Sequence, residues 1–148
     1  MSSASLRPAR RRPYSQLAHT ADLAWRLWGR DLPELFANAG RALSATLTDR
    51  RYLRRREIRE VSLEAGDREA LLVDWLNHLL YLFDIDGFLG RDFEILTLTG
   101  ENLQARAVGE RFDAVRHPER TAVKAATFHR LAIVPVPDGW QATVVLDL

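Results

Sequence analysis

The chain carries 21 basic residues, and only one of them, Lys124, is a lysine. A lysine at one position of an otherwise arginine-only set indicates a need for a compact, flexible ammonium rather than a planar guanidinium. Lys124 lies in the run Val123–Lys124–Ala125–Ala126–Thr127, which favours a β-strand and contains no acid. A chance surface lysine is the alternative interpretation. The question is therefore which groups Lys124 could face.

Acidic oxygens at the two ends of the chain are the first candidates. The sequence stops at Asp147 and Leu148, directly after an apolar β run, whereas most chains end in a frayed polar tail. We therefore expect the Leu148 α-carboxylate to be held beside the Asp147 carboxylate. Two such groups repel each other unless a cation or a donor lies between them.

Asp22 would complete this set if the start of its strand lay beside the chain end. Carboxylate and carbonyl oxygens, in a chain without any Cys, suit Ca²⁺ or Mg²⁺ rather than zinc or copper. The alternative is that Asp22 caps a turn through its own backbone while Asp147 is exposed at a sheet edge. Spacing alone leaves both interpretations open.

Two helices and several strands must position these groups. A strand is expected over residues 23–28, ending at Gly29, after a turn over residues 19–22. Asp31 as N-cap and Pro33 in the first turn predict a helix over residues 32–47. Asp67 predicts the start of a second helix, whose broad apolar stripe indicates a core-facing element and which Gly87 ends.

The remaining strands are expected to form hairpins. The predicted strands cover residues 57–64, 93–99, 102–108, 127–134 and 140–148. Gly100–Glu101 and Pro137–Asp138–Gly139 are the expected turns. This pattern predicts one α+β domain, a largely antiparallel sheet built from hairpins with two helices packed on it.

Composition limits the function classes. The 148 residues include 47% hydrophobic residues and no Cys, and the net charge is +1. These values indicate one globular domain over residues 14–148 and exclude disulfides, thiolate zinc sites and Cys nucleophiles. No apolar run is long enough to span a bilayer and no secretory signal is present, so we expect a cytoplasmic protein without a membrane partner. Residues 1–13 are rich in Arg and predict a disordered tail.

Other motifs give weaker signals. Residues 50–59 contain six arginines, which either contact an RNA backbone or form a solvated loop and strand edge; both interpretations stay open. Asp84–Gly87 lacks the later ligands of a calcium loop. There is no phosphate-binding Gly-rich loop, so nucleotide binding by this chain has little support. The four His residues lack a paired metal-binding spacing, and no Gly-x-Ser-x-Gly elbow supports a Ser/His/Asp triad.

Taken together, these residues resemble the archease family. The resemblance rests on the following segments: His19–Thr20–Ala21–Asp22 with Gly29, Asp31–Leu32 with Glu34–Leu35–Phe36, Leu71–Asn77 with Leu79–Tyr81, Gly109–Glu110, Asp113 with His117–Pro118, Val123–Ala125 with Thr127 and His129, and Val144–Leu148. It runs from about Tyr14 to the end. The departures are the Arg-rich tail and Phe128, where Tyr is more usual.

The resemblance implies a protein cofactor rather than an enzyme. Archeases assist the RtcB-type RNA ligase, which joins RNA ends in tRNA splicing and RNA repair, by promoting its guanylylation and multiple turnover. The family's calcium site carries over onto Asp22, Asp147 and Leu148, and its functional lysine onto Lys124, which would contact the partner's active site. RNA would then be contacted only indirectly or weakly.

Two other function classes remain. In a small metal-dependent phosphoester hydrolase, Asp22 would act as base and Lys124 as electrophile. A chaperone or RNA-binding module would use the face that carries the arginines of residues 50–59. Phosphoester turnover without a partner would favour the first class, and steeply salt-dependent RNA affinity would favour the second.

Overall fold

The computed structural model describes residues 11–17 and 22–148. Within them the chain forms two α-helices, one short 3₁₀ helix and seven strands, all paired antiparallel. In chain order the elements are β1 (Tyr14–Leu17), β2 (Leu23–Gly29), α1 (Leu32–Leu47), η2 (Arg50–Tyr52), β3 (Glu57–Glu64), α2 (Arg68–Asp86), β4 (Phe88–Leu98), β5 (Asn102–Arg111), β6 (Ala125–Val136) and β7 (Gly139–Asp147). The predicted α+β class is confirmed.

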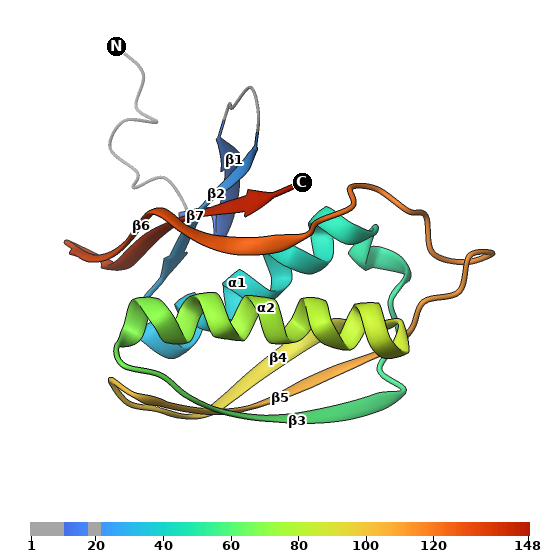
Figure 1. Cartoon of the computed structure of the whole chain (residues 1–148), viewed down its shortest axis with the longest axis horizontal. Helices are drawn as coiled ribbons and strands as arrows, with labels where there is room; N and C mark the ends of the chain where they lie inside the picture. The colour runs from blue at the N-terminus through green and yellow to red at the C-terminus, as the bar shows by residue number, and fades with distance from the viewer. Residues whose placement is uncertain (1–10, 18–21) are drawn as a thin grey trace, which may run out of the picture.

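The strands form two sheets, and the helices lie between them (Figure 1). One sheet has the order β1–β2–β7–β6, and the other has the order β3–β5–β4. The division into two sheets refines the expected arrangement, because hairpin signals predict which neighbours pair but not which sheet each hairpin joins. In the first sheet, β7 lies between β2 and β6, so the end of the chain is an interior strand rather than an edge.

Helix α1 is buried on most of its circumference, as expected for a helix between two layers. Its N-cap Asp31 accepts a hydrogen bond from the Glu34 N–H at 2.8 Å, as predicted. Eleven of its sixteen residues are buried. Among them the Ser44 hydroxyl donates to the Gly90 carbonyl at 2.6 Å, so the helix is tied to the second sheet by a polar bond as well as by packing.

Helix α2 begins and ends at the predicted residues. The Asp67 side chain accepts from the Ala70 N–H at 2.8 Å, and Gly87 takes the left-handed conformation with φ of 68°, which suits glycine at a helix C-terminus. The fully buried Trp75 donates its indole N–H to the Phe36 carbonyl at 2.9 Å. This bond joins the two helices inside the core.

Several strand limits differ from the expectation. β1 was not predicted, and β4 starts at Phe88 rather than at residue 93. The register of β4 against β5 shifts between Gly90 and Asp92, so a bulge carries the strand through residues with a loop-like composition. β6 also begins two residues early, at Ala125, and its register against β7 shifts between Thr127 and Ala132.

Most of the predicted N-terminal tail, residues 1–10, lies outside the described residues, as do residues 19–21 of the turn expected over residues 19–22. Next to the fold, the Pro13 carbonyl accepts from the Trp28 N–H at 3.0 Å, and Arg11 pairs with Asp138 at 3.4 Å. No helix in the described part of the chain is long and apolar enough to cross a membrane.

Candidate functional site

Three segments that are remote in sequence meet at one end of the four-stranded sheet. In the β2–β7 ladder, Leu23 pairs with Leu146, which places Asp22 and Asp147 at neighbouring positions just beyond that pair. In the β6–β7 ladder, Ala125 pairs with Asp147. Asp22, Asp147 and the residue before β6, Lys124, therefore share this end of the sheet, where the C-terminus also lies (Figure 1).

Lys124 is tied directly to the chain end. Its backbone N–H donates to the Asp147 carbonyl at 2.8 Å, which extends the β6–β7 pairing by one residue. The preceding residue, Val123, is buried in the core, whereas Lys124 itself is exposed. Among the residues that the structure describes, the Lys124 ammonium forms no salt bridge, so its charge is available to a ligand or partner.

Asn77 of α2 fixes the start of β6. Its amide donates to the Ala126 carbonyl at 3.2 Å and accepts from the Ala126 N–H at 2.8 Å. β6 is an edge strand, and this pair of bonds satisfies backbone groups that would otherwise lack a partner strand. A side chain from α2 therefore holds β6 two residues from Lys124.

The donor set at this end fits a hard divalent cation. Asp22 is half-buried, whereas Asp147 and Leu148 are exposed. No three His, Cys, Asp or Glu side chains gather as a metal site within residues 11–17 and 22–148. The expected set contains only two such side chains, because its third ligand is the main-chain carboxylate of Leu148. Aspartate and terminal carboxylate oxygens are ligands that Ca²⁺ and Mg²⁺ accept.

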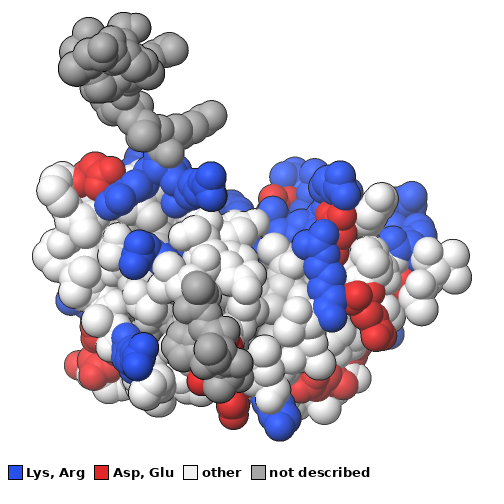
Figure 2. Space-filling model, turned by 90° about the horizontal axis from the view of Figure 1, so that it is seen from above, with Lys and Arg blue, Asp and Glu red and all other residues white. Residues whose placement is uncertain are grey.

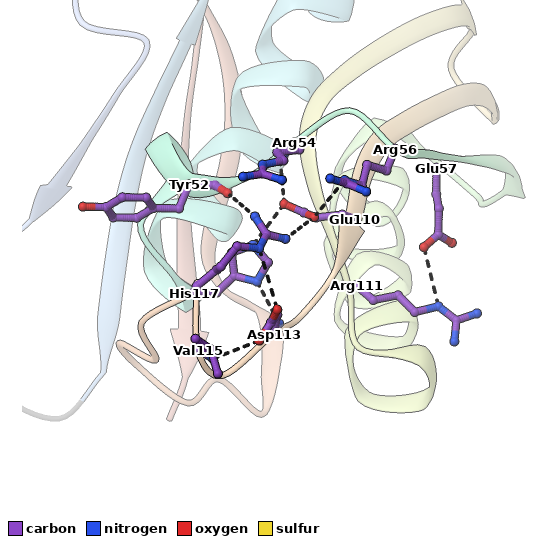
Figure 3. Close-up of polar contacts among 10 residues, drawn as sticks. Tyr52, Arg54, Arg56, Glu57, Glu110, Arg111, Asp113, Val115 and His117 are labelled. Atoms are coloured by element: carbon purple, nitrogen blue, oxygen red, sulfur yellow. Dashed lines mark hydrogen bonds and ion pairs between the residues drawn. The ribbon is translucent and has the colours of Figure 1, made fainter.

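A second polar cluster surrounds Glu110, near the end of β5 (Figure 3). The Glu110 side chain is 5% exposed, and one of its oxygens accepts from the Arg116 guanidinium. The other oxygen accepts from the Arg54 backbone N–H at 2.8 Å and contacts His117 Nε2 at 3.0 Å. Arg56 adds an ion pair at 3.8 Å. The buried charge is thus surrounded by donors.

The hydrogen bonds define the His117 tautomer. The Asp113 N–H donates to His117 Nδ1 at 2.8 Å, so Nδ1 carries no proton. The other nitrogen, Nε2, then carries the proton and donates to Glu110. Because His117 is 1% exposed, this chain of bonds closes the loop that follows β5.

The bonds around Glu110 also set its acidity. Burial raises the pKa of the Glu110 carboxyl, but hydrogen bonds from Arg116, the Arg54 N–H and His117 outweigh burial and lower the pKa to about 2. Glu110 is therefore a structural anion at neutral pH rather than a proton donor.

The loop over residues 112–124 leads from this cluster to Lys124. The Thr48 hydroxyl donates to the Pro118 carbonyl at 2.7 Å, and the Arg120 and Thr121 N–H groups donate to the Leu47 and Thr46 carbonyls. The loop is thus bonded to the C-terminal end of α1 before it reaches the sheet. Glu110 and Lys124 belong to one continuous, anchored segment.

The sequence placed four residues at the site, and the register brings their positions together: Asp22, Lys124, Asp147 and Leu148. Their roles as ligands and partner contact stay predictions. Asn77 and Glu110 were not recognised as supports of this site. A polar residue inside the apolar stripe of α2 was the available signal for Asn77. His117, expected in a loop, is in a loop but fully buried.

Comparisons with known proteins agree on one family. The model of the Archease protein family (MTH1598/TM1083) matches residues 14–148. The protein archease of Methanosarcina barkeri is 38% identical over 139 residues, covering 91% of this chain and 95% of that protein. The protein archease of Pyrococcus abyssi is 39% identical over 134 residues, covering 88% of this chain and 94% of that protein.

Two solved structures share the fold. The solution structure of Methanobacterium thermoautotrophicum protein 1598 is 34% identical with a TM-score of 0.79, covering 92% of this chain and 99% of that one. The Thermotoga maritima crystal structure described as an archease, possible chaperone, is 22% identical with a TM-score of 0.62, covering 95% of this chain and 99% of that one. The second likeness concerns the fold alone.

Proposed function

Because the chain belongs to the archease family, we propose that it is a metal-binding protein cofactor that activates an RtcB-type RNA ligase. In this role it promotes guanylylation and multiple turnover of the ligase in tRNA splicing or RNA repair. The protein acts on its partner and performs no chemistry on its own.

The observation that supports this role is the convergence at the end of the four-stranded sheet. Asp22 and Asp147 occupy neighbouring positions on paired strands, and the Lys124 N–H is bonded to the Asp147 carbonyl. Because exposed charges add little to stability, these groups are available to a ligand or a partner at little cost to the fold.

Asp22, Asp147 and the Leu148 carboxylate would hold a divalent cation, with Ca²⁺ preferred over Mg²⁺ or Mn²⁺. A cation bound there would supply positive charge to phosphate oxygens of the partner's nucleotide pocket. Lys124 would enter that pocket and contact phosphate as a point charge on a four-carbon stem. The Asn77 and Glu110 supports would keep the lysine at a fixed position as the surfaces dock.

The test follows ligase–GMP formation over time. The ligase from the same organism is mixed with GTP and Mn²⁺, with and without this protein. The wild-type chain should accelerate formation of the ligase–GMP adduct, and Lys124→Ala should abolish the acceleration. Arg106→Ala is the matched control, because it also removes one exposed cation, at a site on the other sheet.

Three outcomes contradict the proposal. Adduct formation at the same rate with and without the protein removes the activator role. Full activity of Lys124→Ala removes the assigned lysine. Hydrolysis of a phosphoester by the purified chain with Mn²⁺ and no ligase would favour a metal-dependent hydrolase instead.

A further inference from the structure

The arginines that follow α1 line an open groove. The groove has a volume of about 820 Å³ and lies between η2, the first residues of the loop after Phe112, and the bulged part of β4. Four arginines line it: Arg51, Arg54, Arg91 and Arg116. The apolar part of its wall includes Tyr52 and Val115, which are 50% and 93% exposed. None of these residues belongs to the site at the end of the four-stranded sheet.

The surroundings of the groove are strongly cationic. Lys and Arg side chains gather on the side of the molecule where η2 and the 112–124 loop lie, with a few acids between them (Figures 1 and 2). No carboxylate is among the residues that line the groove, so its four arginines are not balanced by an acid in the wall itself. The chain as a whole has a net charge of only +1, so this region holds a concentrated excess.

The acids of this region form ion pairs with its arginines: Asp49, Asp92, Glu110 and Asp113 each pair with at least one. The Asp49 carboxylate accepts from Nε and Nη2 of Arg51, the latter at 2.6 Å, and the buried Glu110 carboxylate accepts from the Arg116 guanidinium. The Arg116 guanidinium also reaches the Tyr52 carbonyl at 3.4 Å. These bonds fix two guanidinium groups before any ligand arrives, which lowers the entropy lost on binding.

Other arginines retain their charge for a ligand. Arg54 contributes its backbone N–H to Glu110, and among the described residues its guanidinium forms no ion pair. Arg91 has only a 3.8 Å contact with Asp92, which is shared with Arg55 at 2.5 Å. A ligand with repeated negative charges can therefore gain contacts here without breaking a strong internal pair.

We infer that this groove binds the phosphodiester backbone of single-stranded RNA; the choice of RNA over DNA rests on the proposed function, in which the partner acts on RNA. Arginine forms bidentate bonds to phosphate, which suits a backbone contact without sequence readout. The Tyr52 ring lies 5.7 Å from the Arg51 guanidinium and is half-exposed, so a base can stack on it beside the cations. An acidic peptide would use the arginines but not the aromatic face, and for that reason we favour a polynucleotide.

The test measures anisotropy of a fluorescein-labelled ten-nucleotide RNA titrated with the full chain at 50 to 200 mM KCl. With two to three phosphates neutralised, log K should fall against log salt with a slope of about −1.4 to −2.1. Arg54→Ala should weaken binding about three- to fivefold at 50 mM KCl and reduce the slope by about 0.7. Its fold should persist, because the bond to Glu110 comes from the backbone.

Matched variants separate a built groove from general charge. Arg106→Ala removes one cation from the outer face of the second sheet, where Arg106 pairs with Glu60 and Glu94, and should leave binding within a factor of about 1.5. Arg54→Lys keeps the charge and should keep the slope. Tyr52→Ala should weaken binding with no change of slope, since it removes stacking rather than a phosphate contact.

Four results would overturn the inference. These are no binding at 50 mM KCl, equal loss in Arg54→Ala and Arg106→Ala, displacement of RNA by an oligoglutamate of equal charge at the same concentration as unlabelled RNA, and tighter binding of a DNA strand of the same sequence. The measurement uses the isolated chain, so its failure leaves ligase activation untouched.

Discussion

Replacing Glu110 by Gln tests whether the buried anion holds the 112–124 loop in place. The change keeps the shape of the side chain but exchanges one acceptor oxygen for a donor. One Glu110 oxygen faces Arg116, and the other faces both the Arg54 N–H and His117 Nε2. Whichever way the amide turns, its NH₂ group points at donors.

His117 cannot relieve this conflict. A shift of its proton to Nδ1 would place an N–H donor opposite the Asp113 N–H, which now donates to Nδ1 at 2.8 Å. At least one buried donor therefore loses its acceptor, and the arginines lose their counter-charge. Hydrogen bonds to a charged group contribute about 1.5 to 3 kcal/mol each, so we expect Glu110→Gln to lower the free energy of unfolding by about 2 to 4 kcal/mol.

Urea unfolding followed by tryptophan fluorescence measures this loss. Glu60→Gln is the matched control, because Glu60 is 77% exposed and pairs with Arg106 at 3.4 Å on the protein surface. Its effect should stay below about 0.5 kcal/mol. Ordinary surface substitutions change the free energy of unfolding by less than about 0.5 kcal/mol. If Glu110→Gln also stays within about 0.5 kcal/mol, with an unchanged m-value, the cluster does not anchor the loop.

The same variant has a signature in acid. The folded-state pKa of Glu110, about 2, lies below its ordinary value of 4.5. Its contribution is therefore present above pH 4.5 and is lost as the pH falls toward 2, by at most about 3 kcal/mol. Wild-type stability should decline through this window by more than that of Glu110→Gln. Parallel declines in the two proteins would contradict the assignment.

Three further predictions concern the end of the four-stranded sheet. Asn77→Ala leaves both Ala126 backbone groups without their side-chain partner and should lower the free energy of unfolding by about 1 to 2 kcal/mol in a urea titration. The control Asn102→Ala, at an exposed strand end, should leave the free energy of unfolding unchanged. Lys124→Arg should leave the melting temperature within about 1 °C yet reduce ligase stimulation, because the planar group does not replace the ammonium; full stimulation would contradict the lysine-specific role. Appending Gly-Ser after Leu148 moves the α-carboxylate away and should weaken Ca²⁺ binding at least about tenfold in calorimetry, and unchanged affinity would remove Leu148 from the ligand set.

The helices were predictable because residues at their own ends determine where they begin and end. Asp31 and Asp67 accept the expected bonds from the first turns, and Gly87 takes the left-handed conformation that ends α2. The last hairpin was predictable from Pro137–Asp138–Gly139 for the same reason. Each of these signals acts within a few residues and does not depend on the rest of the fold.

The bulged strands were less accessible to local reasoning. Gly90 and Asp92 interrupt the apolar pattern of β4, yet the strand continues because pairing with β5 tolerates the bulge. β1 is four residues long and has no alternating pattern of its own. Its pairing with β2 is a tertiary effect.

The candidate site was partly predictable. The apolar run before Asp147 indicated a paired final strand, which is how Asp22 and Asp147 become neighbours. The Glu110 cluster was hidden because the Arg54 N–H that donates to Glu110 is 56 residues away in sequence, and the nearby Arg116 and His117 do not by themselves indicate that the carboxylate is buried. Asn77 was visible as a polar interruption of an apolar helix face, but its partner on β6 was not.

A calcium titration by isothermal calorimetry tests the central claim, that strand pairing gathers three carboxylates into one cation site beside Lys124. The wild-type chain should bind one Ca²⁺ per molecule, and Asp22→Asn and Asp147→Asn should each weaken binding at least about tenfold while Asp138→Asn does not. Absence of binding by the wild-type chain, or equal affinity in all four proteins, would contradict the account.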